Sequence, residues 1–194
     1  MNKHLPTCFK FGLAGNIFFV LFGIICMIYY AAFGDTNVIV LPIEFAAYTC
    51  EVLGFIFIIL TFVWFSRYIR HRLIMKISFS FYILMELVLM VIELNSYKFE
   101  FYEPYSVVLA IVHSIISAAV CFSFLSLDPT RVKFEMVIIA TCAFILVGMI
   151  GGIINIRIYF GIIINALAYI FLFASIIYML NHEMLDIDCK GDKA

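Results

Sequence analysis

The chain has 194 residues, of which 66% are hydrophobic and 13% are charged, and its formal net charge is −1. In soluble domains about half of the residues are apolar and about a quarter are charged. The composition therefore indicates a polytopic membrane protein whose first partner is the lipid bilayer. The near-zero net charge gives no reason to expect a nucleic-acid partner.

Six apolar runs are long enough to cross about 30 Å of hydrocarbon, which takes roughly 20 helical residues. They cover residues 11–33, 38–65, 73–95, 105–127, 133–154 and 158–180. The connections between them are too short to hold a soluble catalytic or sensory domain. We expect residues 1–194 to form a single all-α domain, a bundle of six transmembrane helices.

Basic residues predict how this bundle is oriented. The connection after the second span, SRYIRHRLIMK, contains Arg67, Arg70, Arg72 and Lys76 and no acid. The connections expected on the opposite side are poor in lysine and arginine. By the positive-inside rule the basic connections are cytoplasmic. The N- and C-termini are then cytoplasmic too, and we expect a multi-pass protein of the cell membrane.

Four acids occupy matching positions in the second and third spans. Glu44 and Glu51 are seven residues apart on the second span, and Glu86 and Glu93 are seven apart on the third. Seven residues is close to two helical turns, so each pair shares one face of its helix. Glu51 and Glu86 each lie about 13 Å below the predicted outer end of their helix, near the middle of the membrane.

Further polar side chains lie at similar depth. His113 on the fourth span and Asn165 on the sixth fall in the outer half, and Arg157 lies at the outer rim. An ionisable side chain near the membrane centre costs about 2.5–3.5 kcal/mol on insertion scales, so these groups should face the bundle interior. The predicted ligand site is an outward-facing acidic cavity formed by Glu44, Glu51, Glu86, Glu93, His113, Arg157 and Asn165.

The deep acids have two interpretations. Two acids and one histidine reach a low-charge state in a dry bundle only by taking up protons or a cation, which favours a site for a proton or a small cationic ligand. Alternatively, protonated glutamates hydrogen-bond across helices and only hold the bundle together.

Small residues predict where helices approach closely. Gly148 and Gly152 form a G-x-x-x-G motif on the fifth span, and Ala110, Ser114 and Ala118 line one face of the fourth. Such stripes let helix backbones come close in membranes. They serve contacts within one subunit, or else a seam with a second copy or another membrane protein.

Motifs of soluble enzymes are absent from the sequence. It contains no H-E-x-x-H, no G-x-S-x-G and no glycine-rich phosphate loop, and its six cysteines form no C-x-x-C. We predict free buried thiols and no enzyme activity, cofactor or metal site. The expected function is that of a transporter or membrane substrate-binding subunit. The alternative is a sensor, immunity or accessory protein that acts through partner proteins without transport.

Overall fold

A computed structural model of the chain describes residues 5–33, 41–66, 73–95, 103–126, 132–153 and 158–184. Every regular element in these ranges is helical, which confirms the predicted all-α class. The elements are α1 (Leu5–Phe33), α2 (Leu41–Ser66), α3 (Leu73–Asn95), α4 (Glu103–Ser123), the 3-10 helix η1 (Phe124–Ser126), α5 (Val132–Ile153) and α6 (Ile158–Asn181).

Five of these helices, α1, α2, α3, α5 and α6, are long and apolar enough to cross a membrane. The chain is therefore a multi-pass membrane protein. The sixth predicted span corresponds to α4, whose apolar part within the described ranges is the shorter stretch Ile111–Ser123. The count of six spans thus stays a prediction.

The helix bounds differ from the predicted spans by three residues or more at two starts and one end. α4 ends at Ser123 instead of residue 127 and is followed by η1. α1 begins at Leu5 instead of residue 11, and α2 begins at Leu41 instead of residue 38. In α1 and α2 a proline is the second residue. Proline suits the first turn because its fixed φ matches the helix and its missing N–H would have had no partner there.

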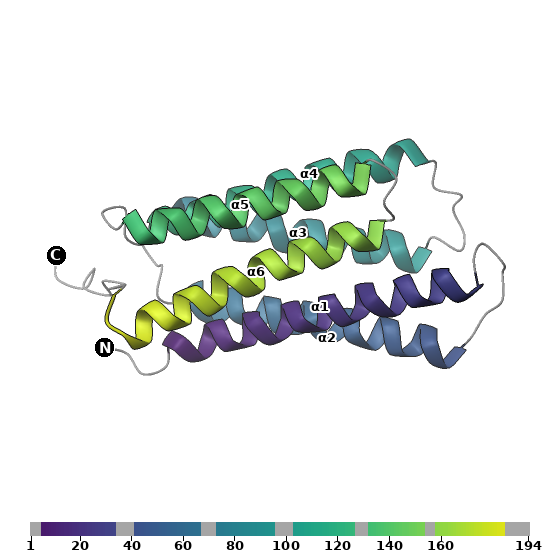
Figure 1. Cartoon of the computed structure of the whole chain (residues 1–194), viewed down its shortest axis with the longest axis horizontal. Helices are drawn as coiled ribbons and strands as arrows, with labels where there is room; N and C mark the ends of the chain where they lie inside the picture. Colours follow the sequence, from purple (N-terminus) through teal and green to yellow (C-terminus); the bar gives the residue numbers. More distant parts are fainter. Residues whose placement is uncertain are drawn as a thin grey trace.

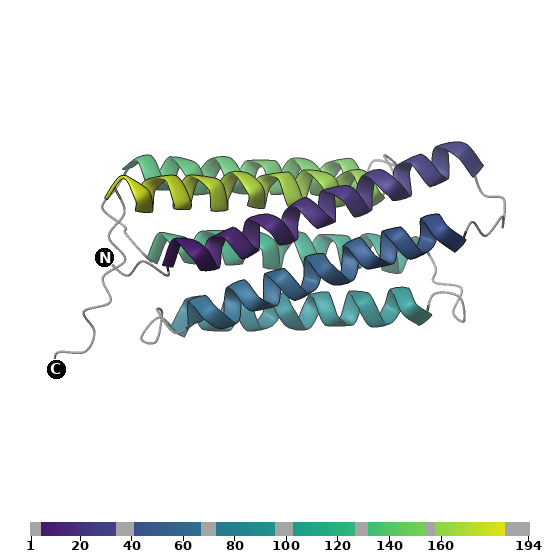
Figure 2. The same ribbon diagram turned by 90° about the horizontal axis from the view of Figure 1, so that it is seen from below.

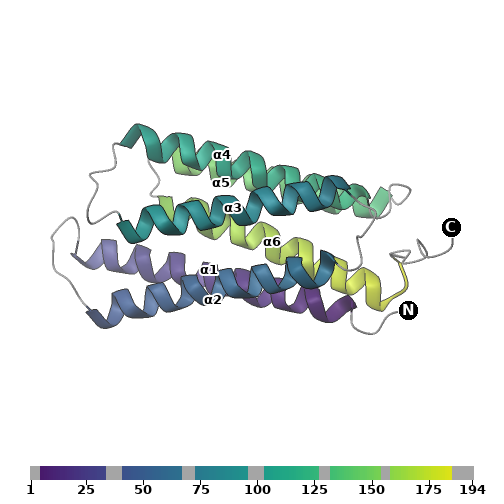
Figure 3. The ribbon, with the colours of Figure 1, turned by 180° about the vertical axis from the view of Figure 1, so that it is seen from behind.

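Successive helices are antiparallel and lie around a ring (Figure 1). α1 packs between α2 and α6, α5 packs between α6 and α4, and α3 packs on α4. α3 contacts α2 more sparsely, which closes the ring. The views from below and from behind show the same order (Figures 2 and 3). The start of α1 and the end of α6 therefore lie at one end of the bundle, on the left in Figure 1.

A cluster of phenylalanine rings closes this end of the bundle. We call it the aromatic core, and it consists of Phe9 of α1, Phe65 of α2, Phe79 of α3, Phe124 of η1 and Phe173 of α6. These side chains are at most 4% exposed, and neighbouring ring centroids lie 4.8–6.4 Å apart. Because each ring comes from a different element, their packing ties five elements together at this end.

Glycines bring helix backbones into direct contact. A Cβ atom on Gly15 would lie 2.9 Å from the Gly54 carbonyl oxygen, so α1 and α2 touch through their backbones. A Cβ atom on Gly148 would lie 3.2 Å from the Gly161 carbonyl oxygen of α6. Gly148 of the predicted packing motif therefore serves a contact within the subunit. Gly152 belongs to α5, but its surroundings lie outside the described side chains.

The small-residue face of α4 borders α5. Ser114 is buried and Ala118 is half-buried, and both line a shallow apolar groove of about 380 Å³ between α4 and α5. The side chain of Ala110 lies outside the described part of the chain. Most of its lining is apolar, and Ile115 and Phe122 of this lining are exposed.

Candidate functional site

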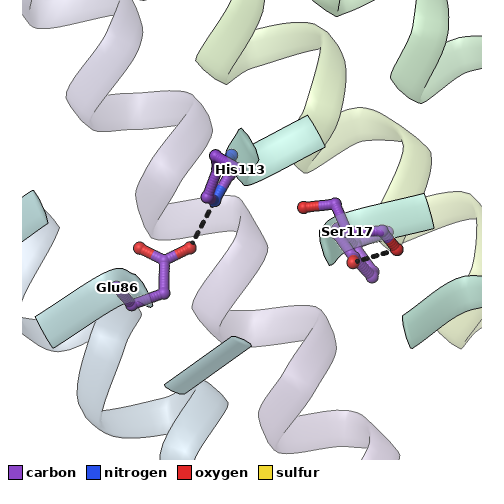
Figure 4. Close-up of polar contacts among 4 residues, drawn as sticks. Glu86, His113 and Ser117 are labelled. Atoms are coloured by element: carbon purple, nitrogen blue, oxygen red, sulfur yellow. Dashed lines mark hydrogen bonds and ion pairs between the residues drawn. The ribbon is translucent and has the colours of Figure 1, made fainter. Parts of the chain in front are cut away.

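Glu86 of α3 and His113 of α4 meet inside the bundle. The Nε2 atom of His113 lies 2.8 Å from the Oε1 atom of Glu86, and the side chains are 20% and 14% exposed. Figure 4 shows the two side chains pointing toward one another from the two helices. A distance of 2.8 Å is typical of a charge-assisted hydrogen bond. The contact therefore joins α3 to α4 by a short polar link in an apolar bundle.

The local pattern of each helix directs these side chains inward. Glu86 continues a face of α3 that carries Met75, Phe79 and Tyr82 at spacings of four, three and four residues, all at most 4% exposed. The opposite face is exposed and apolar at Leu73, Ile77, Leu84, Leu87 and Val91. Because the apolar face is solvated by lipid, the carboxylate is turned to the interior.

His113 follows the same rule on α4. It shares a face with Ser117 and Val120, both completely buried, while Val112 and Ile115 are exposed. His113 is ten residues from the start of α4, and Glu86 is nine residues from the end of α3. Since the two helices are antiparallel neighbours, similar distances from their adjoining ends place both side chains at about the same height.

Two buried tyrosines complete the site. The Tyr82 ring lies 5.8 Å from the His113 ring and 5.9 Å from the ring of Tyr169 on α6, and Tyr82 interacts with the Glu86 carboxylate. The Tyr169 hydroxyl donates a hydrogen bond of 3.0 Å to the Ser117 carbonyl oxygen. We call Tyr82, Glu86, His113, Ser117 and Tyr169 the polar cluster. It links α3, α4 and α6 through side chains that are mostly buried.

Sequence reasoning did not include the two tyrosines, although helical spacing offered a signal for them. Tyr82 is one turn before Glu86, and Tyr169 is one turn after Asn165, so each shares a face with a predicted site residue. Tyr82 also contacts Phe62 of α2, with ring centroids 5.6 Å apart. Phe62 therefore connects the polar cluster to the aromatic core.

Two polar atoms near the site have no hydrogen-bond partner within the described protein. They are the Oγ atom of Ser117 and the Oδ1 atom of Asn165, and both are buried. A buried polar atom without a partner costs about 1–3 kcal/mol. The Ser117 hydroxyl, one turn from His113 on α4, is thus suited to hydrogen-bond a polar atom of a bound molecule.

The other predicted site residues lie on further helices of the bundle. Glu51 is half-buried on the α2 face that carries Phe62. Glu44 accepts a hydrogen bond of 3.4 Å from the Tyr29 hydroxyl of α1. Asn165 turns its Oδ1 atom toward α5, 2.9 Å from the place of a Cβ on Gly148.

Arg157 and the side chain of Glu93 lie outside the described residues. The ion pair of Glu86 and His113 is a direct contact between two of the predicted site residues. Its role in binding a ligand stays a prediction.

The described residues contain no group of three or more His, Cys, Asp or Glu side chains that could hold a metal ion. No protein-family model, curated protein or solved structure matches the chain. The chemistry of the polar cluster is therefore the observation that bears on function.

Proposed function

We propose that this chain is a six-span protein of the cell membrane that acts as a transporter or membrane substrate-binding subunit for a proton or small cationic ligand. The observation that carries the proposal is the 2.8 Å contact between Glu86 and His113, enclosed by a bundle whose outer faces are apolar. Ionisable groups inside a membrane are costly and are characteristic of proton relays and ion pathways.

The pair can hold a proton in two ways without a change in total charge. The proton can lie on His113, which gives an imidazolium beside a carboxylate, or on Glu86, which gives two neutral groups 2.8 Å apart. Uptake of one further proton, or release of the shared one, changes the charge of the site by one unit. In an apolar interior such a change has a large electrostatic effect on neighbouring helices.

The length of α4 supports the sixth span. α4 has 21 residues, which corresponds to about 31 Å of helix and matches the hydrocarbon thickness of about 30 Å. α4 also lies between α3 and α5, both of which are apolar and long enough to span. The cytoplasmic position of both termini is inferred from Arg67, Arg70 and Arg72, which precede α3.

A test of the proposal is proton flux in proteoliposomes. We expect the wild-type protein to carry protons into vesicles under an imposed membrane potential, detected with a trapped pH dye. Glu86→Gln keeps the shape of the side chain but removes its charge, and we expect at least a tenfold lower flux. Glu135→Gln, the same change at the start of α5, is the control and should keep wild-type flux. Equal flux in both variants contradicts the proposal.

One observation favours the alternative of a sensor or accessory protein that binds without transport. The aromatic core closes one end of the bundle beneath the polar cluster, so a translocated ligand has to pass Phe65, Phe124 and Phe173. A protein that only binds needs no such path. If wild-type vesicles show no flux, yet protons shift the melting temperature in a way that Glu86→Gln abolishes, the alternative is the better description.

A further inference from the structure

A pair of cysteines faces across the contact between α4 and α5. Cys121 of α4 is completely buried and Cys142 of α5 is 5% exposed, and neither is in a disulfide. The Cys121 thiol donates to the Ile138 carbonyl oxygen at 3.7 Å. Because Ile138 is one turn before Cys142, this bond places the Cys121 sulfur at the Ile138–Cys142 turn of α5. The two thiols are close enough there to interact with one another.

The surroundings of the pair are almost wholly apolar. Val120, Ile138 and Ile145 are completely buried near it, and the polar side chains that interact with it are Thr141 and Tyr169. The Thr141 hydroxyl donates to the Val137 carbonyl oxygen at 2.8 Å. Within the described residues, two soft sulfur donors therefore meet in a buried and mainly apolar place.

We propose that Cys121 and Cys142 form a binding site for one Cu(I) ion, held between two sulfur atoms. Soft thiolate ligands select Cu(I) over harder cations. A structural zinc site takes four protein ligands, and no group of three His, Cys, Asp or Glu side chains gathers in the described ranges. An ion that accepts two ligands is thus the one that fits.

The charge balance favours a neutral product. Cu(I) forms a bond to one sulfur, the S–H bond of that thiol breaks, and its proton leaves to solvent. The second thiol keeps its proton and binds through a sulfur lone pair. The site then carries no net charge, which suits an apolar interior better than the anion that loss of both protons produces. The ion enters and stays as Cu(I), so no oxidant or reductant takes part.

An apolar groove between α4 and α5 lies near the pair. Its lining includes Ala118 and Phe122, which are close to Cys121 in sequence, and Leu146, one turn after Cys142, but neither cysteine. The site does not depend on the polar cluster or on the function proposed above.

The test is Cu(I) retention by the purified full-length protein in detergent, without oxygen. Protein is mixed with the Cu(I) bicinchoninate complex and desalted, and copper per chain is measured by mass spectrometry. The wild type should retain one more copper per chain than the variant Cys121→Ala/Cys142→Ala. The control Cys26→Ala/Cys50→Ala changes two half-buried cysteines of α1 and α2 and should retain the wild-type amount.

A second variant separates binding from folding. Cys121→Ser keeps a donor for the Ile138 carbonyl oxygen but replaces the soft sulfur by oxygen, so it should fold like the wild type and lose the same one copper. Copper X-ray absorption should show two sulfur neighbours in the wild type, and about one proton should be released per ion. Equal copper retention by the wild type, Cys121→Ser and the double alanine variant overturns the proposal.

Discussion

The contact between Glu86 and His113 has an energetic value that a double-mutant cycle can measure. Replacing each residue by leucine, singly and together, isolates the coupling between them. Neutral hydrogen bonds between membrane helices average about 0.6 kcal/mol and reach about 1.7 kcal/mol. A charge-assisted bond is about twice as strong as a neutral one. At 2.8 Å, with side chains only 14% and 20% exposed, we expect a coupling of about 1.5 kcal/mol.

The unfolding assay can use the only tryptophan of the chain. Trp64 is half-buried near the end of α2, and its ring lies 5.8 Å from that of Phe11 on α1. Its fluorescence reports separation of α1 and α2 when the protein is unfolded by SDS in mixed micelles. Each single variant should be less stable than the wild type, because the remaining partner keeps a buried polar group without its hydrogen bond.

The control cycle pairs Glu86→Leu with Glu135→Leu. Glu135 lies in the first turn of α5, far along the chain and outside the polar cluster, so its coupling to Glu86 should be near zero. If the coupling of Glu86 with His113 is no larger than that of the control cycle, the contact does not hold α3 to α4. The assignment of the pair as the centre of the site then fails.

Three further predictions concern packing, the polar cluster and topology. Gly15→Ala should lower the free energy of unfolding by about 1–3 kcal/mol in the same SDS titration, because its Cβ would lie 2.9 Å from the Gly54 carbonyl oxygen. The control Ala143→Val, on an exposed face of α5, should change the free energy of unfolding little. Tyr169→Phe should cost about 1 kcal/mol by removing the 3.0 Å hydrogen bond to α4, and an unchanged midpoint contradicts this. Reporter fusions should place the C-terminus inside the cell and residues 96–104 outside; an external C-terminus reverses the orientation.

The sequence predicts the heights of residues better than it predicts their neighbours. Apolar runs locate the helices, and the rise of 1.5 Å per residue then sets the depth of each polar group. Glu86 and His113 could be expected at about the same height because they lie at similar distances from the connection between their helices. Their inward direction follows from the cost of exposing an ionisable group to lipid.

Which helices stand side by side around the ring is much harder to infer. Glu44 was predicted to line the outer acidic cavity, and the partner that the sequence did not indicate is Tyr29, whose hydroxyl donates to Glu44 because α1 is the main neighbour of α2. Asn165 turns toward Gly148 because α5 packs on α6 and offers a space without a side chain. Lateral order depends on the fit of many side chains at once, and short motifs carry little of that information.

The cysteine pair is a second case in which the sequence did not indicate which side chains are neighbours. A search for C-x-x-C spacing assumes that two thiols meet within one turn of one chain segment. Cys121 and Cys142 instead meet across two antiparallel helices, in the halves that adjoin residues 127–131. Adjacent helices joined by a short connection are the one case in which lateral contact follows from chain order. Comparing distances from that connection is the signal that could have found the pair.

The contact between Glu86 and His113 also changes what a cationic ligand has to do. From the sequence, the deep acids required protons or a cation to reach a low charge. An imidazolium 2.8 Å from a carboxylate already forms a neutral pair, so Glu86 needs no added cation while His113 holds its proton. A cation that binds the Glu86 carboxylate must therefore displace that proton. Binding of the cation and release of a proton are then coupled. In the pH range where His113 is protonated before the cation binds, each tenfold fall in proton concentration can raise the cation affinity by up to tenfold. A transporter with this site would exchange the cation for a proton, whereas the occupancy of a sensor would depend on the ratio of cation to proton concentration.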